Sequence, residues 1–137
     1  MTVSSIGDVS FGQELPAFVP DTSLETGRKF ADLVGFGGGR FSDHEAARKE
    51  GFPGAIIPGV LSQGYLLAMI HAWAPDAEIR KVDTVFRAPV VADEAHSITG
   101  VVTDINEEDG IVEIDLTVTN DKGETRVFGT ASVSLTH

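Results

Sequence analysis

The sequence predicts a single α+β domain in which one central apolar helix is wrapped by a curved antiparallel sheet. First, residues 58–73 form an apolar stretch without aspartate, glutamate, lysine or arginine. Second, the half of the chain after residue 78 alternates apolar and polar residues between tight turns, as half-buried strands do. Third, a length of 137 residues fits one domain, and no repeat or linker divides it. We therefore assign residues 1–137 to one domain.

The apolar stretch is the element around which the rest is organised. Pro58 and Gly59 mark its start, and Ala74-Pro75 stops it. A helix that is apolar over most of its circumference is a buried helix. It is shorter than the roughly 20 apolar residues that a bilayer span requires, so we expect no membrane insertion. An ordinary packed helix of a small α/β domain is the alternative interpretation.

The elements before this helix are short. An extended segment is expected at 17–20, followed by a helix at 24–34 that Asp21-Thr22-Ser23 can cap and Gly35 ends. Three glycines at 37–39 indicate a tight or mobile loop, which lacks the Gly-Lys-Ser/Thr of a phosphate-binding loop. Ser42-Asp43 precedes a short helix at 44–49, with Glu45 placed for a capping box.

The elements after the helix have the period of strands. Alternating patterns predict strands at 79–90, 97–105, 111–119 and 125–135. Turn sequences at 106–110 and 120–123 separate the last three of them. Successive strands joined by tight turns form an antiparallel meander, which supplies the curved sheet that the helix needs.

Composition excludes several classes of function. A formal net charge of −11 argues against a nucleic-acid partner, because such binding depends on neutralising phosphates. The chain has no cysteine, and its start does not resemble a signal peptide, so we expect a cytoplasmic protein. Eight of the ten basic residues lie between 28 and 87. They are either a local cationic mouth for an anionic small molecule or scattered solvated charges.

Two sequence blocks carry a family resemblance. From Phe30 the chain reads FADLVGFGGGRFSDHEAARKEGFPGAIIPGVLSQGYL, and from Val85 it reads VFRAPVVADEAHSITGVV. Both blocks resemble the MaoC-like (R)-specific enoyl-CoA hydratases and hydroxyacyl-thioester dehydratases. The resemblance implies a hotdog fold over roughly the whole chain, an acyl-CoA or acyl-carrier thioester as ligand, and assembly as a dimer.

The catalytic pattern of that family is missing. The resemblance places the family's aspartate at Phe36, its Asn-Pro pair at Gly38-Gly39 and its histidine at Phe41. Hydration of an enoyl thioester needs a base to activate water and an acid to protonate the α-carbon, and phenylalanine can do neither. Both members of the hydratase dyad are therefore absent, and the catalytic residues are unknown. Asp43 and the neighbouring His44 match family positions that are not catalytic.

Part of the binding site is expected to remain. In the family, a backbone amide at the start of the central helix binds the thioester carbonyl, and Gly59 occupies that place, after Pro58 where a histidine is common. Arg40 and Arg87 are candidates for contact with coenzyme A phosphates, although solvated arginines are the alternative. We expect no cofactor, and no cluster of His, Asp and Glu predicts a metal site.

Three functions follow from these expectations. The first is a non-catalytic subunit that pairs with a catalytic MaoC-like partner to form an enoyl-CoA hydratase or dehydratase. The second is an enzyme of altered chemistry on the same scaffold, such as thioester hydrolysis, isomerisation or cyclisation in a biosynthetic pathway. The third is a module that binds an acyl thioester without chemistry. A homodimer and a heterodimer with the catalytic subunit both remain open.

Overall fold

The structure is a computed structural model, and it describes residues 2–137. Within these residues, three α-helices and four β-strands follow one another. The helices are α1 (Leu24–Val34), α2 (His44–Lys49) and α3 (Gly59–Trp73), with short 3₁₀ turns η1 (Ile6–Asp8) and η2 (Gly39–Phe41). The strands are β1 (Glu78–Phe86), β2 (His96–Asn106), β3 (Ile111–Asn120) and β4 (Thr125–Ser134).

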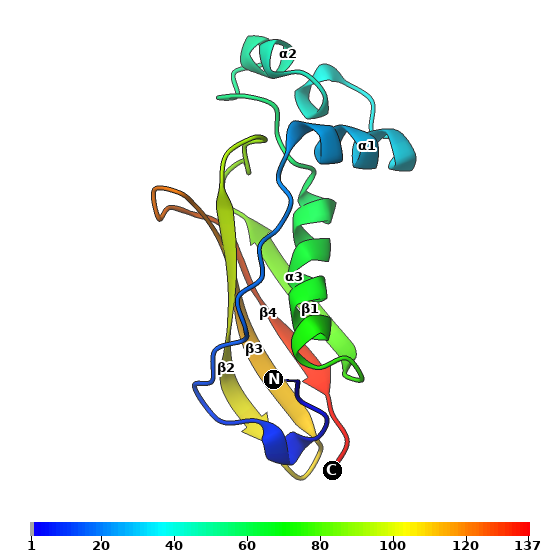
Figure 1. The fold of residues 1–137 in the computed structure, drawn as a ribbon, viewed down its shortest axis with the longest axis vertical. Helices are drawn as coiled ribbons and strands as arrows, with labels where there is room; N and C mark the ends of the chain where they lie inside the picture. Colours follow the sequence, from blue (N-terminus) through cyan, green and yellow to red (C-terminus); the bar gives the residue numbers. More distant parts are fainter. Residues whose placement is uncertain (1) are drawn as a thin grey trace.

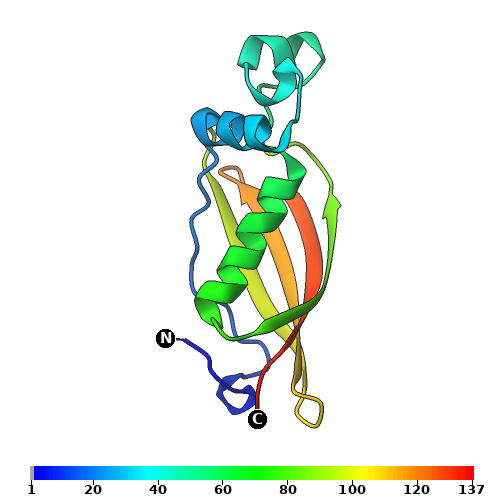
Figure 2. The same cartoon turned by 90° about the vertical axis from the view of Figure 1, so that its right-hand side faces the viewer.

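The four strands form one antiparallel sheet in the order β1-β4-β3-β2. The sheet curves around α3, which crosses its concave face (Figures 1 and 2). The amino-terminal segment runs beside β2 and touches it through two bridges, Glu14 to Val101 and Phe18 to Ile98. Strand β1 forms the opposite edge, and no strand within residues 2–137 pairs with its outer side.

The core lies between α3 and the sheet. Leu66, Met69, Ile70 and Trp73 of α3 are each at most 1% exposed, and the inward side chains of the strands pack against them. The expectation that α3 is buried around most of its circumference holds on one side only. Its other side is exposed at five small, apolar or histidine positions, Val60, Gly64, Ala68, His71 and Ala72. A four-stranded sheet covers one face of a helix, and the apolar composition of the helix extends beyond that face.

Helices α1 and α2 lie at the end of the molecule where α3 begins (Figures 1 and 2). Ser23 Oγ accepts a hydrogen bond from the Thr26 amide at 3.2 Å, and Gly35 ends α1 in the left-handed conformation with φ 78°. Asp43 caps α2 by accepting from the Ala46 amide at 3.1 Å. The predicted capping box with Glu45 is wrong, because the cap is Asp43 and the third helical position is therefore alanine.

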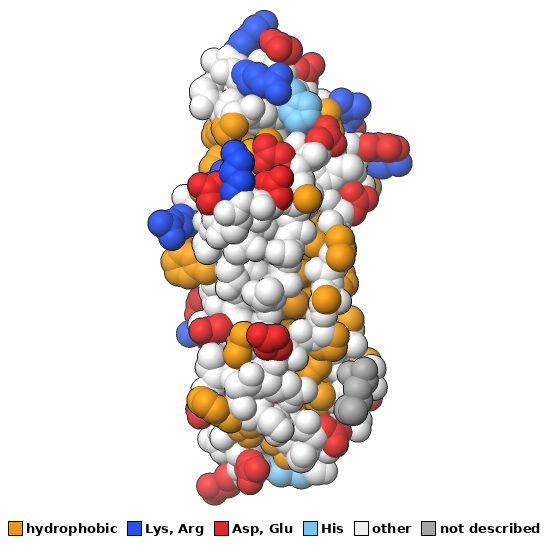
Figure 3. Space-filling view, turned by 60° about the vertical axis from the view of Figure 1, so that its left-hand side comes forward, with side chains coloured by type: hydrophobic (Ala, Val, Ile, Leu, Met, Phe, Trp, Pro, Cys, Tyr) orange, Lys and Arg blue, Asp and Glu red, His pale blue; other side chains and the backbone are white. Residues whose placement is uncertain are grey.

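No helix within residues 2–137 has the length and apolar character needed to cross a membrane. Within the same residues, no group of three or more His, Asp and Glu side chains is placed to hold a metal ion. On the face shown in Figure 3, basic side chains lie mostly in the upper half and are interspersed with acidic ones.

Candidate functional site: an apolar pocket at the start of α3

A pocket of about 400 Å³ lies where the first turn of α3 meets the end of β1. Phe41 of η2 and residues 56–57 form one wall, and residues 86–90 form a second wall next to it. Gly59, Ser62 and Val127 complete the lining. This volume suits a small apolar ligand or the acyl part of a larger one.

Backbone pairing holds the two walls together. The Ile57 amide donates to the Val90 carbonyl at 2.8 Å, and the Ala92 amide donates to the Ala55 carbonyl at 2.8 Å. Ile56 and Val91 form the antiparallel bridge between these two bonds. The segment that enters α3 and the segment that follows β1 therefore form a short two-stranded ribbon.

The start of α3 presents unpaired backbone donors to this region. Pro58 is the amino-terminal cap residue, is fully buried and offers no side-chain cap. Its carbonyl accepts from the amides of Leu61 at 3.0 Å and Ser62 at 3.2 Å. The amides of Gly59 and Val60 have no protein partner among residues 2–137. Free amides at a helix amino terminus favour an oxygen atom that carries partial negative charge.

At position 59, the space left for such an oxygen depends on whether the residue has a side chain. A Cβ atom at this position would lie 3.0 Å from Cε1 of Phe86. Glycine therefore keeps the helix start close to the Phe86 ring, and Gly59 is one of the residues that line the pocket. The predicted role of Gly59 in binding an acyl carbonyl is compatible with this placement.

The two phenylalanines at the expected dyad positions lie beside each other. The ring centroids of Phe36 and Phe41 are 5.8 Å apart, and the Phe36 ring also meets Phe30 edge-on at 6.4 Å. Phe41 lines the pocket, whereas Phe36 stands behind it and is 39% exposed. The two residues selected by the family resemblance are therefore adjacent in the structure, and one of them, Phe41, lines the pocket.

The two candidate arginines are placed differently. Arg87 lies directly after β1 and lines the pocket. Arg40 is outside the lining: its guanidinium pairs with Glu50 at 2.6 Å and sits over the Phe52 ring at 5.3 Å. A guanidinium engaged by a carboxylate and an aromatic face is less available to a phosphate, so Arg87 is the stronger candidate for an anionic ligand group.

No carboxylate or imidazole is among the residues that line the pocket. Its polar groups are backbone amides, the Ser62 hydroxyl and the Arg87 guanidinium. Such a site can orient a carbonyl and hold an anionic group, but these lining residues include no ordinary acid–base pair for adding water to a double bond.

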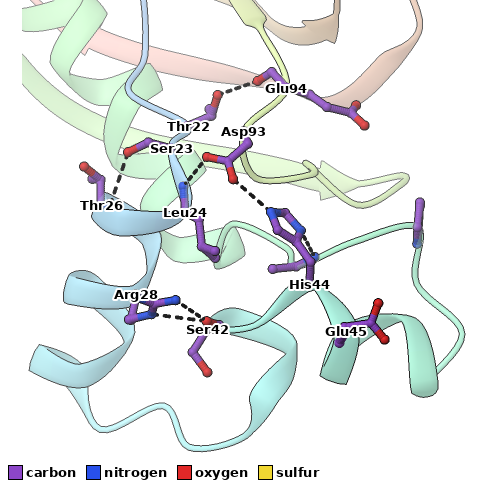
Figure 4. Close-up of polar contacts among 12 residues, drawn as sticks. Thr22, Ser23, Leu24, Thr26, Arg28, Ser42, His44, Glu45, Asp93 and Glu94 are labelled. Atoms are coloured by element: carbon purple, nitrogen blue, oxygen red, sulfur yellow. Dashed lines mark hydrogen bonds and ion pairs between the residues drawn. The ribbon is translucent and has the colours of Figure 1, made fainter.

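A carboxylate and an imidazole do meet nearby, outside this lining (Figure 4). His44 Nε2 lies 2.9 Å from Asp93 Oδ2, and the Ala55 amide donates to His44 Nδ1 at 2.9 Å. Because Nδ1 accepts a hydrogen bond from the Ala55 amide, Nε2 is the nitrogen that bears hydrogen and donates a hydrogen bond to Asp93. The other Asp93 oxygen accepts from the Leu24 amide at 2.9 Å, so each partner is already engaged.

Both the hydrogen bonds of the Asp93 carboxylate and the backbone conformation of Asp93 hold this residue in place. The hydrogen bond from His44, followed by that from the Leu24 amide, lowers the pKa of Asp93 below its ordinary value of 3.8. Its φ of 67° lies in the left-handed region, which aspartate tolerates better than most residues. His44 and Asp93 therefore connect α2, the start of α1 and the β1–β2 connection, and their geometry is structural.

The remaining histidines lie away from the pocket lining. His71 is exposed on the outer side of α3. His96 begins β2 and is buried, with Nδ1 2.9 Å from the Glu94 carbonyl. The carboxyl-terminal His137 contacts the Glu107 carbonyl at 2.7 Å. None of these imidazoles belongs to the pocket.

Sequence reasoning missed Ser62 as a site residue. It is the only hydroxyl side chain among the lining residues and is 3% exposed. Its signal was a polar residue one turn after the helix-opening glycine within an otherwise apolar stretch.

Comparisons with known proteins place the fold. No protein-family model matches the chain, and no curated protein matches its sequence. Among solved structures, the chain is similar to the R-hydratase PhaJ1 from Pseudomonas aeruginosa in its unliganded form, with a TM-score of 0.88 and 19% identity over 97% of this chain and 86% of that one. It is similar to the (R)-hydratase from A. caviae involved in PHA biosynthesis, with a TM-score of 0.85 and 19% identity over 93% of this chain and 97% of that one.

A third similar structure is the ChsH1-ChsH2 complex from Mycobacterium tuberculosis, with a TM-score of 0.83 and 20% identity over 93% of this chain and 98% of that one. At such identities the likeness establishes the fold and leaves the activity to the site. The chain therefore has the α+β hotdog fold, and its structural neighbours include MaoC-like dehydratases and (R)-hydratases.

Proposed function

We propose that this chain is a non-catalytic MaoC-like subunit that binds an acyl thioester and supports a catalytic partner in an enoyl-CoA hydratase or dehydratase. The observation that carries the proposal is the lining of the pocket. At the start of α3, where the hydratase dyad is expected, the pocket is walled by Phe41 and contains no carboxylate or imidazole. Phe36, at the other dyad position, packs against Phe41.

The polar groups of the pocket favour a thioester as the ligand. The Gly59 amide has no protein partner among the described residues, and Gly59 belongs to the lining, which favours a carbonyl oxygen as the acceptor. Apolar side chains, among them Ile56, Val90 and Val127, offer an environment for an acyl chain. Arg87 at the rim is placed for the phosphates of coenzyme A or the phosphopantetheine of a carrier protein.

The exposed edge of the sheet supports pairing with another subunit. Strand β1 leaves its outer backbone groups without a strand partner among residues 2–137. Val85 and Phe86 of β1 are 51% and 52% exposed, and Val60 at the start of α3 is 57% exposed. An open edge with exposed apolar side chains invites association with a second sheet. The similar ChsH1-ChsH2 structure is itself a complex.

The test is co-purification with a dyad-bearing MaoC-like protein of the same organism, followed by assays of crotonyl-CoA hydration. The chain alone should bind the thioester and show no hydration, whereas the mixture should form a stable complex of defined mass. Val85→Lys should weaken that complex, because it places a charge on the β1 edge. Thr99→Lys, an exposed position on β2, is the matched control.

Two results would contradict the proposal. A chain that remains alone or self-associates without binding any dyad-bearing homologue would remove the partner role. Turnover of an acyl thioester by the purified chain would favour altered chemistry on the same scaffold instead.

A further inference from the structure

Ser62 is the buried polar side chain of the pocket that the fold itself does not use. The residue is 3% exposed and lines the pocket. Its amide donates to the Pro58 carbonyl at 3.2 Å, whereas its hydroxyl has no hydrogen bond to any of residues 2–137. Among these residues, the sealed side-chain atoms without a partner are Trp73 Nε1, His96 Nε2 and Arg126 Nε. Ser62 Oγ is not one of these sealed atoms, and Ser62 is a residue of the pocket lining.

A second and independent set of donors lies one turn away. The amides of Gly59 and Val60 lack protein partners within the described part of the chain. Helix α3 is 15 residues long, so its amino terminus carries the partial positive charge of an extended helix. Residues three apart on a helix share a face, with Cβ positions about 5–6 Å apart. The Ser62 hydroxyl and the Gly59 amide are therefore two separate donors at neighbouring points of one apolar pocket.

A ligand that fills the pocket displaces water from the Ser62 hydroxyl, which then loses its hydration unless the ligand offers a hydrogen-bond partner. A purely aliphatic acyl chain at this place would leave that loss uncompensated. An acyl group with a second oxygen close to its carbonyl would satisfy both donors at once. The two oxygens of a 3-oxoacyl group lie on C1 and C3 with one carbon between them, so one ligand of this class can offer an oxygen to each of the two donors.

We propose that Ser62 is a specificity-determining residue that donates a hydrogen bond to the C3 oxygen of a 3-oxoacyl thioester whose C1 carbonyl oxygen accepts from the Gly59 amide. This inference rests on the proposed binding of an acyl thioester and adds the class of acyl group. Ser62 acts through binding and positioning, because no bond to its oxygen forms or breaks.

The experiment compares two thioesters of equal chain length, acetoacetyl-CoA and butyryl-CoA, by isothermal titration calorimetry of the intact protein and of its complex. The wild type should bind acetoacetyl-CoA about 5- to 10-fold more tightly than butyryl-CoA. Ser62→Ala should abolish this preference by weakening acetoacetyl-CoA alone, and Ser62→Thr, which keeps the hydroxyl, should retain it. Gly64→Ala is the control on the exposed side of α3, where an added Cβ meets nothing within 4 Å.

The possible outcomes distinguish a failure of the proposed role of Ser62 from a failure of the proposed thioester binding. Equal affinity of the wild type for both thioesters, or an unchanged preference in a folded Ser62→Ala variant, would overturn the role of Ser62 and leave thioester binding intact. An equal weakening of both ligands in Ser62→Ala would assign the hydroxyl to the C1 carbonyl and also overturn the inference. Failure of the wild type to bind either thioester would overturn the proposed function with it.

Discussion

Two polar groupings lie near the start of α3, and they differ in what their hydrogen bonds are used for. In the pair formed by His44 and Asp93, both ring nitrogens and both carboxylate oxygens have partners. At the first turn of α3, the Gly59 amide and the Ser62 hydroxyl have no partners among residues 2–137. The first grouping holds three segments of the chain together, and the second leaves donors open toward a pocket.

This contrast shows that residue type is a weak guide to a functional site. A histidine beside an aspartate has the composition of a catalytic pair, yet the Ala55 amide occupies the nitrogen that would have to accept a proton. A serine and a glycine have no such composition, yet their donors are free. Unused hydrogen-bonding capacity next to a pocket is the more informative property, and it predicts opposite effects of mutation in the two places.

The largest expected effect is on stability. His44→Ala removes the acceptor of the Ala55 amide, whose residue is fully buried, and the donor to Asp93. Leaving that buried amide unpaired should lower the free energy of unfolding by about 1–3 kcal/mol, measured by urea denaturation followed by circular dichroism. Ser62→Ala should change it much less. A His44→Ala variant as stable as the wild type, with thioester binding lost, would assign His44 to the site.

The next effect is on ligand affinity. Gly59→Ala places a methyl group against the Phe86 ring and narrows the pocket. Thioester affinity should fall by about 10-fold, as expected when a single methyl group is misplaced in a binding site. Gly64→Ala on the same helix should leave affinity unchanged. Equal affinities of the two alanine variants, measured by calorimetry, would place the ligand away from the start of α3.

A smaller effect on ligand affinity is expected from replacing Arg87 at the rim of the pocket. Arg87→Gln should weaken a coenzyme A thioester about 3-fold at low salt and less at high salt, because an exposed charge is screened. The same acyl group on pantetheine, which lacks phosphates, should bind the variant and the wild type equally. Arg80→Gln is the control, since Arg80 pairs with Glu78 at 3.1 Å outside the pocket. Equal losses for both thioesters would give Arg87 a packing role.

The smallest effect concerns acid stability. The pKa of Asp93 is lowered in the folded protein by the hydrogen bonds from His44 and the Leu24 amide. Its stabilising contribution is therefore present above the unfolded pKa and is lost as the pH falls through the lower folded pKa. Between about pH 5 and pH 3, Asp93→Asn should lose less stability than the wild type in urea titrations. The difference should be small, because the Asp93 side chain is 54% exposed.

The sequence was sufficient for the strands and helices because their signals are local. Alternation predicted the strand at 111–119, and β3 spans Ile111–Asn120. Pro58 and Ala74 bound the central helix as expected. Phe41, Gly59 and Arg87 were selected through the family resemblance, and they line one pocket.

What the sequence did not reveal depends on contacts between distant residues. His44 and Asp93 are 49 positions apart, and no spacing rule links them. The importance of Ser62 depends on what its hydroxyl fails to contact, which periodicity does not report. The exposed side of α3 was not predicted, because composition gives the polarity of a helix. It does not give the number of strands that cover the helix.

The ribbon of residues 55–57 and 90–92 joins the two walls of the pocket through backbone hydrogen bonds. A ligand that touches Ile56 on one wall and Val90 on the other would hold this ribbon closed. Amide hydrogen exchange at Ile57 and Ala92 should then slow together on ligand addition, whereas exchange in the β3–β4 turn should not. Exchange at these two amides would therefore report whether the pocket is occupied, also for ligands that undergo no reaction.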